Sequence, residues 1–507
     1  MILPVVTSAQ MRQAEDAAFA RGTSAEALMN QAGAGVAQTV QQFFPRHGYC
    51  LVFSGKGNNG GDALVAATQL KRLGWDIDVH LSFPESECGD LLRKKITEFR
   101  DTPPHVSAVS AANVGAERTP KVILDGLLGL GSKPPLRGSI LTACREINRL
   151  RREDNAYVIA VDQPTGLDGD SGEADPDCVV ADFTVTIATA KRGLLADRAS
   201  NFVGRLGVIA LPELWKDGLS LVHGRADASP EETVATAASL RGLLPRRPFD
   251  SYKNQFGRIG IVAGSRGFAG AASMCAWGAL RGGGGLVEVF VPEEIYEIVA
   301  GVAPFESMIK PLKSYRDLVE EKIDAWGIGP GLGHENAQEI IELVQRVEVP
   351  MVVDADALNA MSGNVSVLKS CRGPRLLTPH PGEMKRLAGD QKISRAELAR
   401  QFTNEFSITL LLKGSRTLVA ENGKGVSYNT SGNPGMATGG MGDILTGVCA
   451  ALLGQRLPPF DAARVGAWVC GRAAEIAIFN DGASEQSLLP RDILTNLGRA
   501  FHDLQGH

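Results

Sequence analysis

The chain has no apolar run of the roughly 18 residues that a membrane-spanning helix needs, and its N-terminus lacks a basic stretch followed by an apolar one. We therefore expect a cytoplasmic protein with no membrane partner. It also has no basic surplus, because 52 Lys and Arg stand against 57 Asp and Glu, for a formal net charge of -5. Since proteins that bind nucleic acids usually carry excess positive charge, we expect no nucleic-acid partner.

Metal-binding and disulfide patterns are missing as well. The eight cysteines are scattered without a Cys-x-x-Cys pair, and no histidines stand at a metal-ligand spacing. We expect reduced thiols that lie mostly in the core.

The length of the chain predicts more than one domain. At 507 residues it exceeds the roughly 250 to 300 residues at which a single core stops growing, so we expect two domains. Residues 211–250 are polar and broken by prolines, although residues 230–244 could hold a helix. We place the boundary near residue 220, which gives domains at 1–220 and 221–507.

Both halves alternate short apolar runs with segments of helical length. The pattern is helical over 7–44 and predicts strands at 49–53, 77–81, 122–124, 157–161 and 183–187. In the second half it predicts strands at 259–263, 286–291, 325–328, 351–354, 375–378 and 409–413. Because such alternation is typical of parallel sheets covered by helices, we expect two three-layer α/β/α domains, the first of them Rossmann-like.

The segment NPGMATGGMGD at residues 433–443 is the most informative one in the chain. Its glycines let the backbone turn sharply and expose N–H groups ahead of an apolar helix, which is the arrangement of an anion site. A phosphoryl group in transfer would be stabilised there, and Asp443 is a candidate base for a substrate hydroxyl. The alternative is a structural turn in which Asp443 caps the helix.

In the first half, SGKGNNGGD at residues 54–62 directly follows a predicted strand and contains the glycine pattern of dinucleotide sites. Asp125 and Asp162 end two further strands. Since neighbouring parallel strands end at one crevice, Asn59, Asp125 and Asp162 can face a common ligand. With the hydroxyl of Thr165 they would also suit a hard monovalent or divalent cation. The alternative is a set of separate helix caps.

Further motifs follow the strands of the second half. They are AGSRGFAGAA at 263–272, GIGPGLG at 327–333, DADALN at 354–359, LTPHPGEMKRL at 377–387 and LKGSRT at 412–417. Each alone is typical of a turn or a cap, but their joint placement after strands indicates one cleft.

The whole chain resembles the bifunctional NAD(P)H-hydrate repair enzymes, in which an epimerase domain of the YjeF N-terminal type precedes a ribokinase-like dehydratase domain. The motifs GKGNNGGD, VDQPTGLDGD, DADALN, LTPHPGEM and GMATGGMGD occur in that family's order and spacing. Four positions depart from it: Ala63 and Asn254 replace a usual Gly, Thr165 replaces Ser, and Met441 replaces Thr. Thr165 keeps the hydroxyl, whereas Met441 removes one beside the anion site.

The resemblance implies repair of NADH and NADPH damaged by addition of water across the C5=C6 bond of the nicotinamide ring. The first domain would interconvert the R and S hydrates, with Asp162 as the candidate for proton transfer and K⁺ bound by Asn59, Asp125 and Thr165. The implied substrate contacts are Asn58, Asn59, Gly60, Gly61, Asp62, Gly129, Leu130, Gly131, Ser132, Lys133, Pro134, Pro135 and Asp162.

By the same resemblance, the second domain would dehydrate the S hydrate with ADP as co-substrate and Mg²⁺. Asp443 would deprotonate the C6 hydroxyl, a phosphoryl group would be transferred to that oxygen, and phosphate would leave to restore the double bond. Residues 437–442 would stabilise the phosphoryl group. The implied substrate contacts are Ala263, Gly331, His380 and Asp443, and the implied nucleotide contacts are Lys413, Gly414, Ser415, Arg416, Thr417 and Gly442. We also expect a homo-oligomer.

Two alternatives stay open at the level of the sequence. The chain could be a plain small-molecule kinase, since vitamin-precursor kinases share the second fold and its Gly-Asp loop. The first domain could instead be a binding module without activity, as in protein and RNA-decapping scaffolds. The presence of the N-terminal domain argues against the first alternative, and the combination of Asn59, Asp125 and Asp162 argues against the second.

Overall fold

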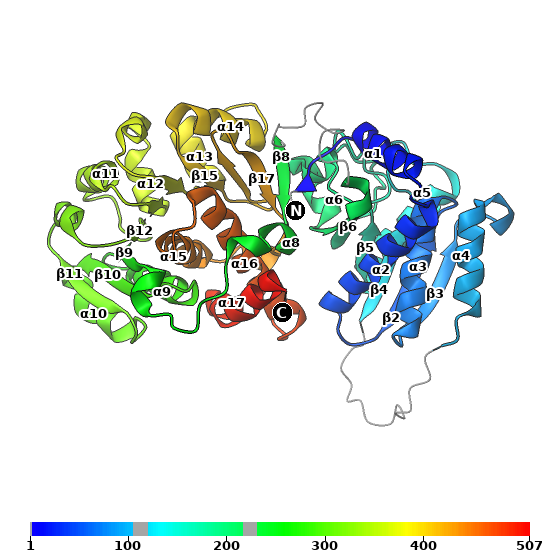
Figure 1. Cartoon of the computed structure of the whole chain (residues 1–507), viewed down its shortest axis with the longest axis horizontal. Helices are drawn as coiled ribbons and strands as arrows, with labels where there is room; N and C mark the ends of the chain where they lie inside the picture. The colour runs from blue at the N-terminus through cyan, green and yellow to red at the C-terminus, as the bar shows by residue number, and fades with distance from the viewer. Residues whose placement is uncertain (1–2, 105–119, 216–230, 507) are drawn as a thin grey trace, which may run out of the picture. The chain divides into compact units, whose positions relative to one another are not determined.

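The computed structural model describes residues 3–104, 120–215 and 231–506. The chain divides into two compact units, Leu3–Pro230 and Glu231–His507, each built around its own β-sheet (Figure 1). The predicted boundary at residue 220 lies outside the described residues.

The first unit contains a six-stranded sheet in the order β3-β2-β4-β5-β6-β7, in which every pairing is parallel. The strands of this sheet are β2 (Tyr49–Ser54), β3 (Asp76–Leu81), β4 (Lys121–Gly126), β5 (Tyr157–Val161), β6 (Phe183–Ile187) and β7 (Arg205–Ile209). The short strand β1 (Leu3–Pro4) precedes them in the chain and is not part of this sheet. Its helices are α1 (Ser8–Ala20), α2 (Ala25–Phe43), α3 (Asn58–Arg72), α4 (Asp90–Asp101), α5 (Gly138–Glu153) and α6 (Ser200–Val203).

The predicted helical stretch at 7–44 is two helices rather than one. Gly22 takes a left-handed φ of +93°, which ends α1, and the Ser24 hydroxyl accepts a hydrogen bond from the backbone N–H of Ala27 to start α2.

Helices cover both faces of this parallel sheet. α5 packs on one face, where strand residues such as Phe53, Ile123 and Val158 share a core with Ile140 and Ile147 of the helix. Since successive strand residues point to opposite faces, the other face is left for α3, which packs between α2 and α4. The predicted three-layer arrangement of this unit is confirmed.

The second unit has a mixed sheet in the order β8-β17-β16-β15-β14-β13-β12-β9-β10-β11. Its strands are β8 (Glu232–Ala235), β9 (Arg258–Val262), β10 (Leu286–Pro292), β11 (Met308–Leu312), β12 (Ala325–Ile328), β13 (Met351–Val353), β14 (Arg375–Leu377), β15 (Thr409–Leu412), β16 (Leu418–Glu421) and β17 (Gly425–Asn429). Its helices are α8 (Ala237–Leu240), α9 (Ala269–Arg281), α10 (Tyr296–Val302), α11 (Ala337–Arg346), α12 (Ala355–Met361), α13 (Pro381–Ala388), α14 (Arg395–Phe406), α15 (Met441–Gly454), α16 (Pro459–Phe479) and α17 (Pro490–Gln505).

The sheet is parallel from β11 to β15 and then turns antiparallel through the β16–β17 hairpin. α9, α15, α16 and α17 bury one face in a core with strand residues such as Ile261, Val289 and Leu411. α11 to α14 lie on the other side of the sheet in Figure 1. A helix over residues 230–244 is compatible with the sequence. The first part of that range is a strand instead, because Thr233 and Val234 belong to β8, which pairs with β17.

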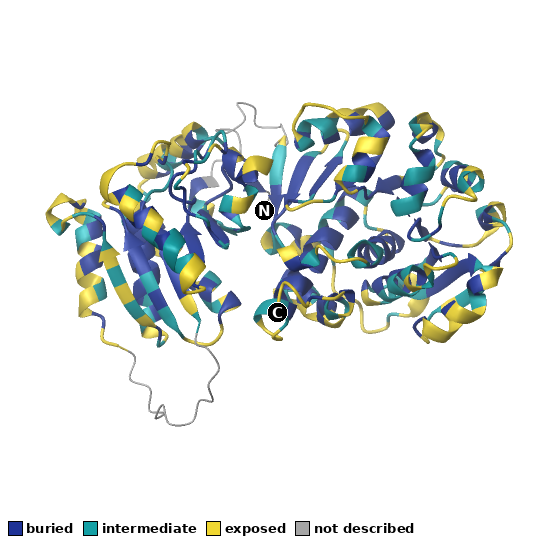
Figure 2. Ribbon diagram, turned by 180° about the vertical axis from the view of Figure 1, so that it is seen from behind, coloured by how far each residue is buried: buried dark blue, intermediate teal, exposed yellow. Residues whose placement is uncertain are grey.

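Burial follows the layers. In Figure 2 the central strands of each unit are buried and the exposed residues lie on the outer sides of the helices. All eight cysteines are free thiols, and seven of them are buried, as expected from their scatter in the sequence. Within the described ranges, no helix has the length and apolar character needed to cross a bilayer.

Candidate active sites

The first turn of α3 forms one wall of the site in the N-terminal unit. The N-cap is Gly57, which makes no side-chain cap, so backbone N–H groups at the helix end stay available. A Cβ on Gly60 would come within 2.4 Å of the Ser54 hydroxyl oxygen, and one on Gly61 within 2.4 Å of the Met29 methyl group. These two glycines therefore let α3 pack tightly against the end of β2 and against α2.

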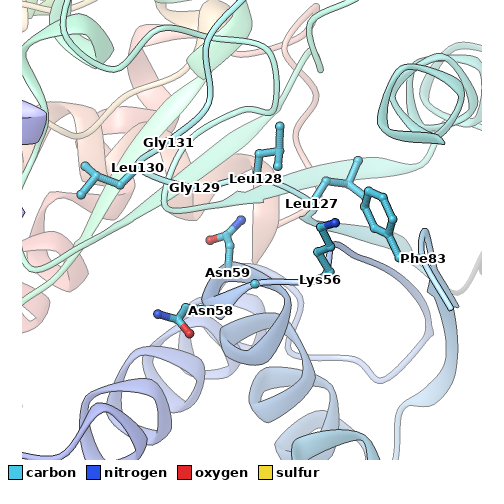
Figure 3. Close-up of a pocket in the computed structure, with 10 residues that line it drawn as sticks. Lys56, Asn58, Asn59, Phe83, Leu127, Leu128, Gly129, Leu130 and Gly131 are labelled. Carbon is cyan, nitrogen blue, oxygen red and sulfur yellow. The ribbon is translucent and has the colours of Figure 1, made fainter. Parts of the chain in front are cut away.

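Asn59 is the polar side chain of this turn that most clearly lacks a protein partner. It is only 9% exposed, and within the described part of the chain its Nδ2 has no hydrogen bond. Its amide is directed towards the loop that carries Gly129 (Figure 3). Because leaving a buried amide unpaired costs about 1–3 kcal/mol, such a group is typical of a ligand site.

Asp125 and Thr165, two of the three predicted cation ligands, are in direct contact. Asp125 ends β4 and is fully buried; its Oδ1 accepts from the Thr165 hydroxyl at 2.7 Å and its Oδ2 from the Thr165 backbone N–H at 2.8 Å. Burial raises the pKa of Asp125 to about 6, although these hydrogen bonds oppose the rise. Among the described residues, no cation pairs with this carboxylate. Because a buried, unpaired carboxylate is unfavourable, a bound cation would stabilise its ionised form.

Asp162 follows β5 and adopts a left-handed φ of +69°, which is uncommon for a residue other than glycine. Its Oδ1 forms an ion pair with the buried ammonium group of Lys191 and accepts from the Ile187 backbone N–H at 3.1 Å. Lys191 was not predicted as a site residue. Its contact fixes the orientation of the Asp162 carboxylate at the strand end.

Two cavities meet around Asn58, Asn59, Gly129 and Leu130. The larger, of about 330 Å³, is also lined by Lys56, Gly57, Phe83, Leu127, Leu128 and Gly131 (Figure 3). The smaller, of about 200 Å³, is lined in addition by Asp62, Asp162 and Glu15 together with apolar residues of α1 and α2. The structure thus places Asp162 and one end of each predicted substrate loop around connected space.

The rest of the second predicted loop, residues 132–135, does not line either cavity. Ser132 is buried and its hydroxyl oxygen accepts from the backbone N–H of Gly166 at 2.9 Å, while Lys133 lies 3.8 Å from Asp168. These contacts hold the loop against the segment that carries Thr165.

In the C-terminal unit, the Gly-rich loop leads into α15 as the sequence predicts. The helix begins after Gly440, whose φ is +91° and which makes no side-chain cap. Asp443 lies in the first turn of α15, not at the N-cap. Burial raises the pKa of Asp443 to about 6; the carboxylate of Asp354 raises it further, and Lys413 opposes the rise.

Asp354, Lys413 and Thr446 form a buried polar cluster beside Asp443. Lys413 Nζ donates to Asp354 Oδ1 at 2.8 Å, and the Thr446 hydroxyl donates to Oδ2 at 2.8 Å. Burial lowers the pKa of Lys413, but the surrounding carboxylates of Asp354, Glu383 and Asp443 raise it above its ordinary value overall. A Cβ on Gly442 would lie 3.4 Å from Lys413 Nζ, so the predicted base, lysine and loop glycine come together.

His380 is linked to the same cluster by Glu383 of α13, which contacts both His380 and Lys413. Its Nδ1 accepts from the backbone N–H groups of Gly382 at 2.9 Å and Glu383 at 3.3 Å, so His380 is the N-cap of this helix. The carboxylate of Glu383 in turn lies 4.0 Å from Lys413 Nζ. The half-exposed imidazole is therefore held at the edge of the site.

Ala263 and Gly331 lie where β9 and β12 end. Ala263 is fully buried, and the N–H of Gly264 donates to the carbonyl of Pro330 at 2.8 Å, which joins the two strand ends. Gly331 has a φ of +66°, and a Cβ there would come within 2.8 Å of Phe268 Cβ.

The predicted nucleotide segment, residues 413–417, is held by Arg395 of α14. Its guanidinium donates to the carbonyl oxygens of Leu412, Lys413 and Arg416 at 3.1–3.2 Å. The Thr417 hydroxyl donates to the Gly414 carbonyl at 3.2 Å, which closes the segment into a turn. Ser415 is part of the same turn.

Sequence reasoning missed four polar residues of these sites: Glu15, Lys191, Asp354 and Thr446. The motif DADALN marked the position of Asp354, so that residue had a signal. Thr446 follows the Gly-rich motif by three residues but carries no signal of its own. Glu15 and Lys191 stand in segments without a turn motif, and only tertiary structure brings them to the site.

Comparison with known proteins matches both units. Residues 25–193 match the family model described as YjeF-related protein N-terminus, and residues 259–497 match the model described as NAD(P)H-hydrate dehydratase. The bifunctional NAD(P)H-hydrate repair enzyme Nnr of Moorella thermoacetica is 35% identical over 535 residues, covering 99% of this chain and 97% of that protein. The Escherichia coli enzyme of the same name is 33% identical over 497 residues, covering 96% and 92%.

A solved structure matches the second half. It is the ADP/ATP-dependent NAD(P)H-hydrate dehydratase from Bacillus subtilis, co-crystallized with ATP/Mg²⁺, which is 29% identical. The match covers 55% of this chain and 100% of that chain, with a TM-score of 0.48.

Fold and sites together define a two-domain α/β enzyme, in which a parallel-sheet domain of the YjeF N-terminal type precedes a mixed-sheet domain that matches the NAD(P)H-hydrate dehydratase model. Full-length relatives share both domains in this order. The chain belongs to the family of bifunctional NAD(P)H-hydrate repair enzymes.

Proposed function

We propose that this protein restores hydrated NADH and NADPH by two reactions at two separate sites: epimerisation in Leu3–Pro230 and ADP-dependent dehydration of the S hydrate in Glu231–His507. The observation that carries the proposal is Asp443, a carboxyl with a raised pKa in the first turn of α15, beside Lys413 and a helix N-terminus that no side chain caps. A plain kinase would leave the N-terminal site without a role.

In the dehydration, the Asp443 carboxylate takes the proton of the C6 hydroxyl while that oxygen attacks the terminal phosphorus of ADP. The phosphorus–oxygen bond to AMP breaks, and residues 437–442 stabilise the charge on the phosphoryl group. Phosphate then leaves with the electron pair of the C6–O bond, and loss of the proton on C5 restores the C5=C6 bond. The products are NADH or NADPH, AMP and phosphate.

The nucleotide phosphates would lie over the first turn of α15, against Gly442 and Lys413, with the turn from Gly414 to Thr417 beside them. Mg²⁺ would neutralise phosphate charge, and Glu383, near Lys413, is the carboxylate available to it. Ala263, Gly331 and His380 would line the hydrate side of the site. These residues fit because β-strand ends and one helix N-terminus meet there.

In the epimerisation, the hydrated ring would occupy the smaller N-terminal cavity, where the ion-paired carboxylate of Asp162 takes part in proton transfer. K⁺ would be held by Asn59, Asp125 and Thr165. The fit rests on Asp125, a fully buried carboxylate that no cation of the described residues neutralises. The potassium charge would keep it ionised beside the substrate.

The larger cavity would take the remainder of the dinucleotide. Lys56 lines it, and so do Asn58 and Gly57 at the open end of α3, so a pyrophosphate would meet a cation and free amides. Asp62 and the loop residues from Gly129 to Gly131 complete the lining of the proposed substrate site, whereas Gly60, Gly61 and residues 132–135 would support it from outside the two cavities. A homo-oligomer and a cytoplasmic location remain predictions.

The test uses separated R and S hydrates and the full-length protein. We expect NADH to form from the S hydrate only when ADP is present, with equal amounts of AMP and phosphate, and the two hydrates to equilibrate without nucleotide. Accumulation of a phosphorylated product would instead indicate a kinase. Absence of R-to-S conversion, beside normal dehydration, would reduce the first unit to a binding module.

A further inference from the structure

The smaller N-terminal cavity contains one more carboxyl group than the proposed chemistry uses. Glu15 of α1 lines it together with Asp62 and Asp162. Only Asp162 among the three is joined to a cation, Lys191. Within the described part of the chain, no hydrogen bond or ion pair engages the carboxyl of Glu15 or that of Asp62, which is 8% exposed and faces this cavity.

Glu15 is placed by the packing of α1. It stands four residues after Met11 and three before Ala18, both fully buried, so it lies on the packed side of the helix. The start of the helix is fixed by the hydroxyl of Thr7, which accepts a hydrogen bond from the Gln10 N–H in a capping box.

Val6, in the segment just before α1, ties this helix to the segment that carries Lys191 through an isolated parallel bridge. The N–H of Val6 donates to the carbonyl of Ala190 at 3.0 Å, and the N–H of Arg192 donates to the carbonyl of Val6 at 2.9 Å. Glu15 is therefore held in a defined position relative to the Asp162–Lys191 pair, although it is distant from both in the sequence.

The carboxyls of this cavity differ in their electrostatic surroundings, which suits them to different roles. Burial raises the pKa of Glu15, and the neighbouring carboxylates of Asp162 and Asp16 raise it too. Lys191 lowers it, but by less, so the pKa stays above its ordinary value. Burial likewise raises the pKa of Asp62 well above its ordinary value. A cavity that holds one ion-paired carboxylate beside a second, unpaired carboxyl whose pKa is raised offers a base and an acid side by side.

We propose that Glu15 is a catalytic residue of the epimerase, the acid that protonates the leaving C6 hydroxyl group of the hydrate while Asp162 serves as the base. This inference rests on the proposed epimerase function of the first unit. It adds a residue on α1, outside the strand-end motifs, to the reacting groups.

The step balances without a further reagent. Glu15 gives its proton to the C6 hydroxyl oxygen, the C6–O bond breaks and its electron pair leaves with water, and the N1 lone pair forms a C6=N1 iminium bond. A water molecule then adds to the other face of C6, N1 recovers its lone pair, and Asp162 takes the proton that this water loses. Proton exchange with solvent restores both carboxyls. Once Glu15 has given up its proton, its carboxylate carries the negative charge that stabilises this cationic intermediate in the cavity.

The test compares Glu15→Gln with Asp16→Asn in the full-length protein. Asp16 is the exposed neighbour on α1, so its variant is the matched control. We expect Glu15→Gln to slow R-to-S conversion by about 100-fold or more, the usual effect of removing a general acid, with Asp16→Asn near the native rate. Dehydration of pure S hydrate should be unchanged in both. Native epimerisation in Glu15→Gln overturns the inference, whereas absence of epimerisation in the native protein overturns the proposed function itself.

A second variant separates chemistry from folding. In Glu15→Ala, added acetate should restore part of the epimerisation if the missing group is an acid. Lack of rescue together with a lower melting temperature of the first unit would assign Glu15 a structural role and contradict the inference. With the native protein in ¹⁸O-labelled water, each epimerisation should incorporate one labelled oxygen at C6; epimerisation without label would show that the C6–O bond stays intact.

The pH profile gives an independent readout. The titratable and charged groups that act on Glu15 are Arg12 and Asp16 of α1, Asp62 of α3, Asp162 and Lys191. Because an acid must be protonated, native epimerisation should fall as the pH rises through the raised pKa of Glu15. That fall should vanish in Glu15→Gln. Its persistence there would assign the acid to Asp62 and overturn the role of Glu15.

Discussion

Replacing Asp443 with Asn removes the proposed base of the dehydratase while keeping the size and hydrogen-bonding reach of the side chain. We expect S-hydrate turnover to fall by about two to four orders of magnitude, the usual range for a general base. ADP affinity should survive, because the amides of residues 437–442 and Lys413 are unchanged. Epimerisation in the other unit should also proceed at the native rate.

The same substitution that lowers turnover should increase the stability of the folded protein. The pKa of Asp443 is raised to about 6 in the folded state, so burying its carboxylate costs free energy above that pH, and the cost disappears below the ordinary pKa of the group. The difference corresponds to at most about 3 kcal/mol at neutral pH. Asp443→Asn should therefore melt at the same or a higher temperature than the native protein above pH 6, with no gain at pH 3.

The same pKa sets the pH dependence of catalysis. A base works in its ionised form, so native dehydration should rise with pH through about 6 and level off above it. The assay is NADH formation from pure S hydrate with saturating ADP, with ADP affinity and melting temperature measured on the same sample. Near-native turnover in Asp443→Asn would refute the reasoning, because a merely structural residue in this turn would tolerate a substitution that keeps its size and hydrogen-bonding reach.

Three further predictions follow from the same geometry. A fragment that begins between residues 222 and 231 should fold and dehydrate the S hydrate with ADP, since Glu231–His507 is a compact unit with its own core; inactive or insoluble fragments with several start points would contradict this division. Asp125→Ala should abolish the rise in melting temperature that K⁺ gives the native protein and slow epimerisation without affecting dehydration; an undiminished K⁺ shift in the variant would remove Asp125 from the site. Lys413→Met should destabilise the second unit by about 3–5 kcal/mol, because it leaves the buried carboxylate of Asp354 without its cation, and a melting curve unchanged from the native one would show that the pair is dispensable.

Most of the sheet framework could be predicted from apolar periodicity. The predicted bounds of β5, β6 and β12 agree with the structure residue for residue, because these strands are continuous apolar or β-branched runs. Two of the strands that were not predicted have an interrupted apolar pattern. β11 contains Lys310 and Pro311 and lies at the edge of its sheet, and β7 contains Arg205 and Gly207.

The candidate sites divide in the same way. Asn59 and Asp443 stand in first helical turns that follow Gly-rich loops, and Asp125 stands near the end of β4. Motifs at such places can be found in the sequence, and the topology of parallel sheets brings strand ends together. Lys191 and Glu15 could not be found in this way, because they reach the N-terminal cavity through the pairing of Val6 with its neighbours and through the packing of α1. Such long-range contacts leave no local pattern in the sequence.

The central claim is that one chain carries out both repair reactions. The most direct measurement is incubation of pure R hydrate with the full-length protein, with and without ADP, followed by quantification of R hydrate, S hydrate, NADH, AMP and phosphate. With ADP, all of the R hydrate should become NADH with one AMP and one phosphate for each molecule; without ADP, only the S hydrate should appear. R hydrate that stays unchanged in both cases, or ends as a stable phosphorylated compound, would contradict the account.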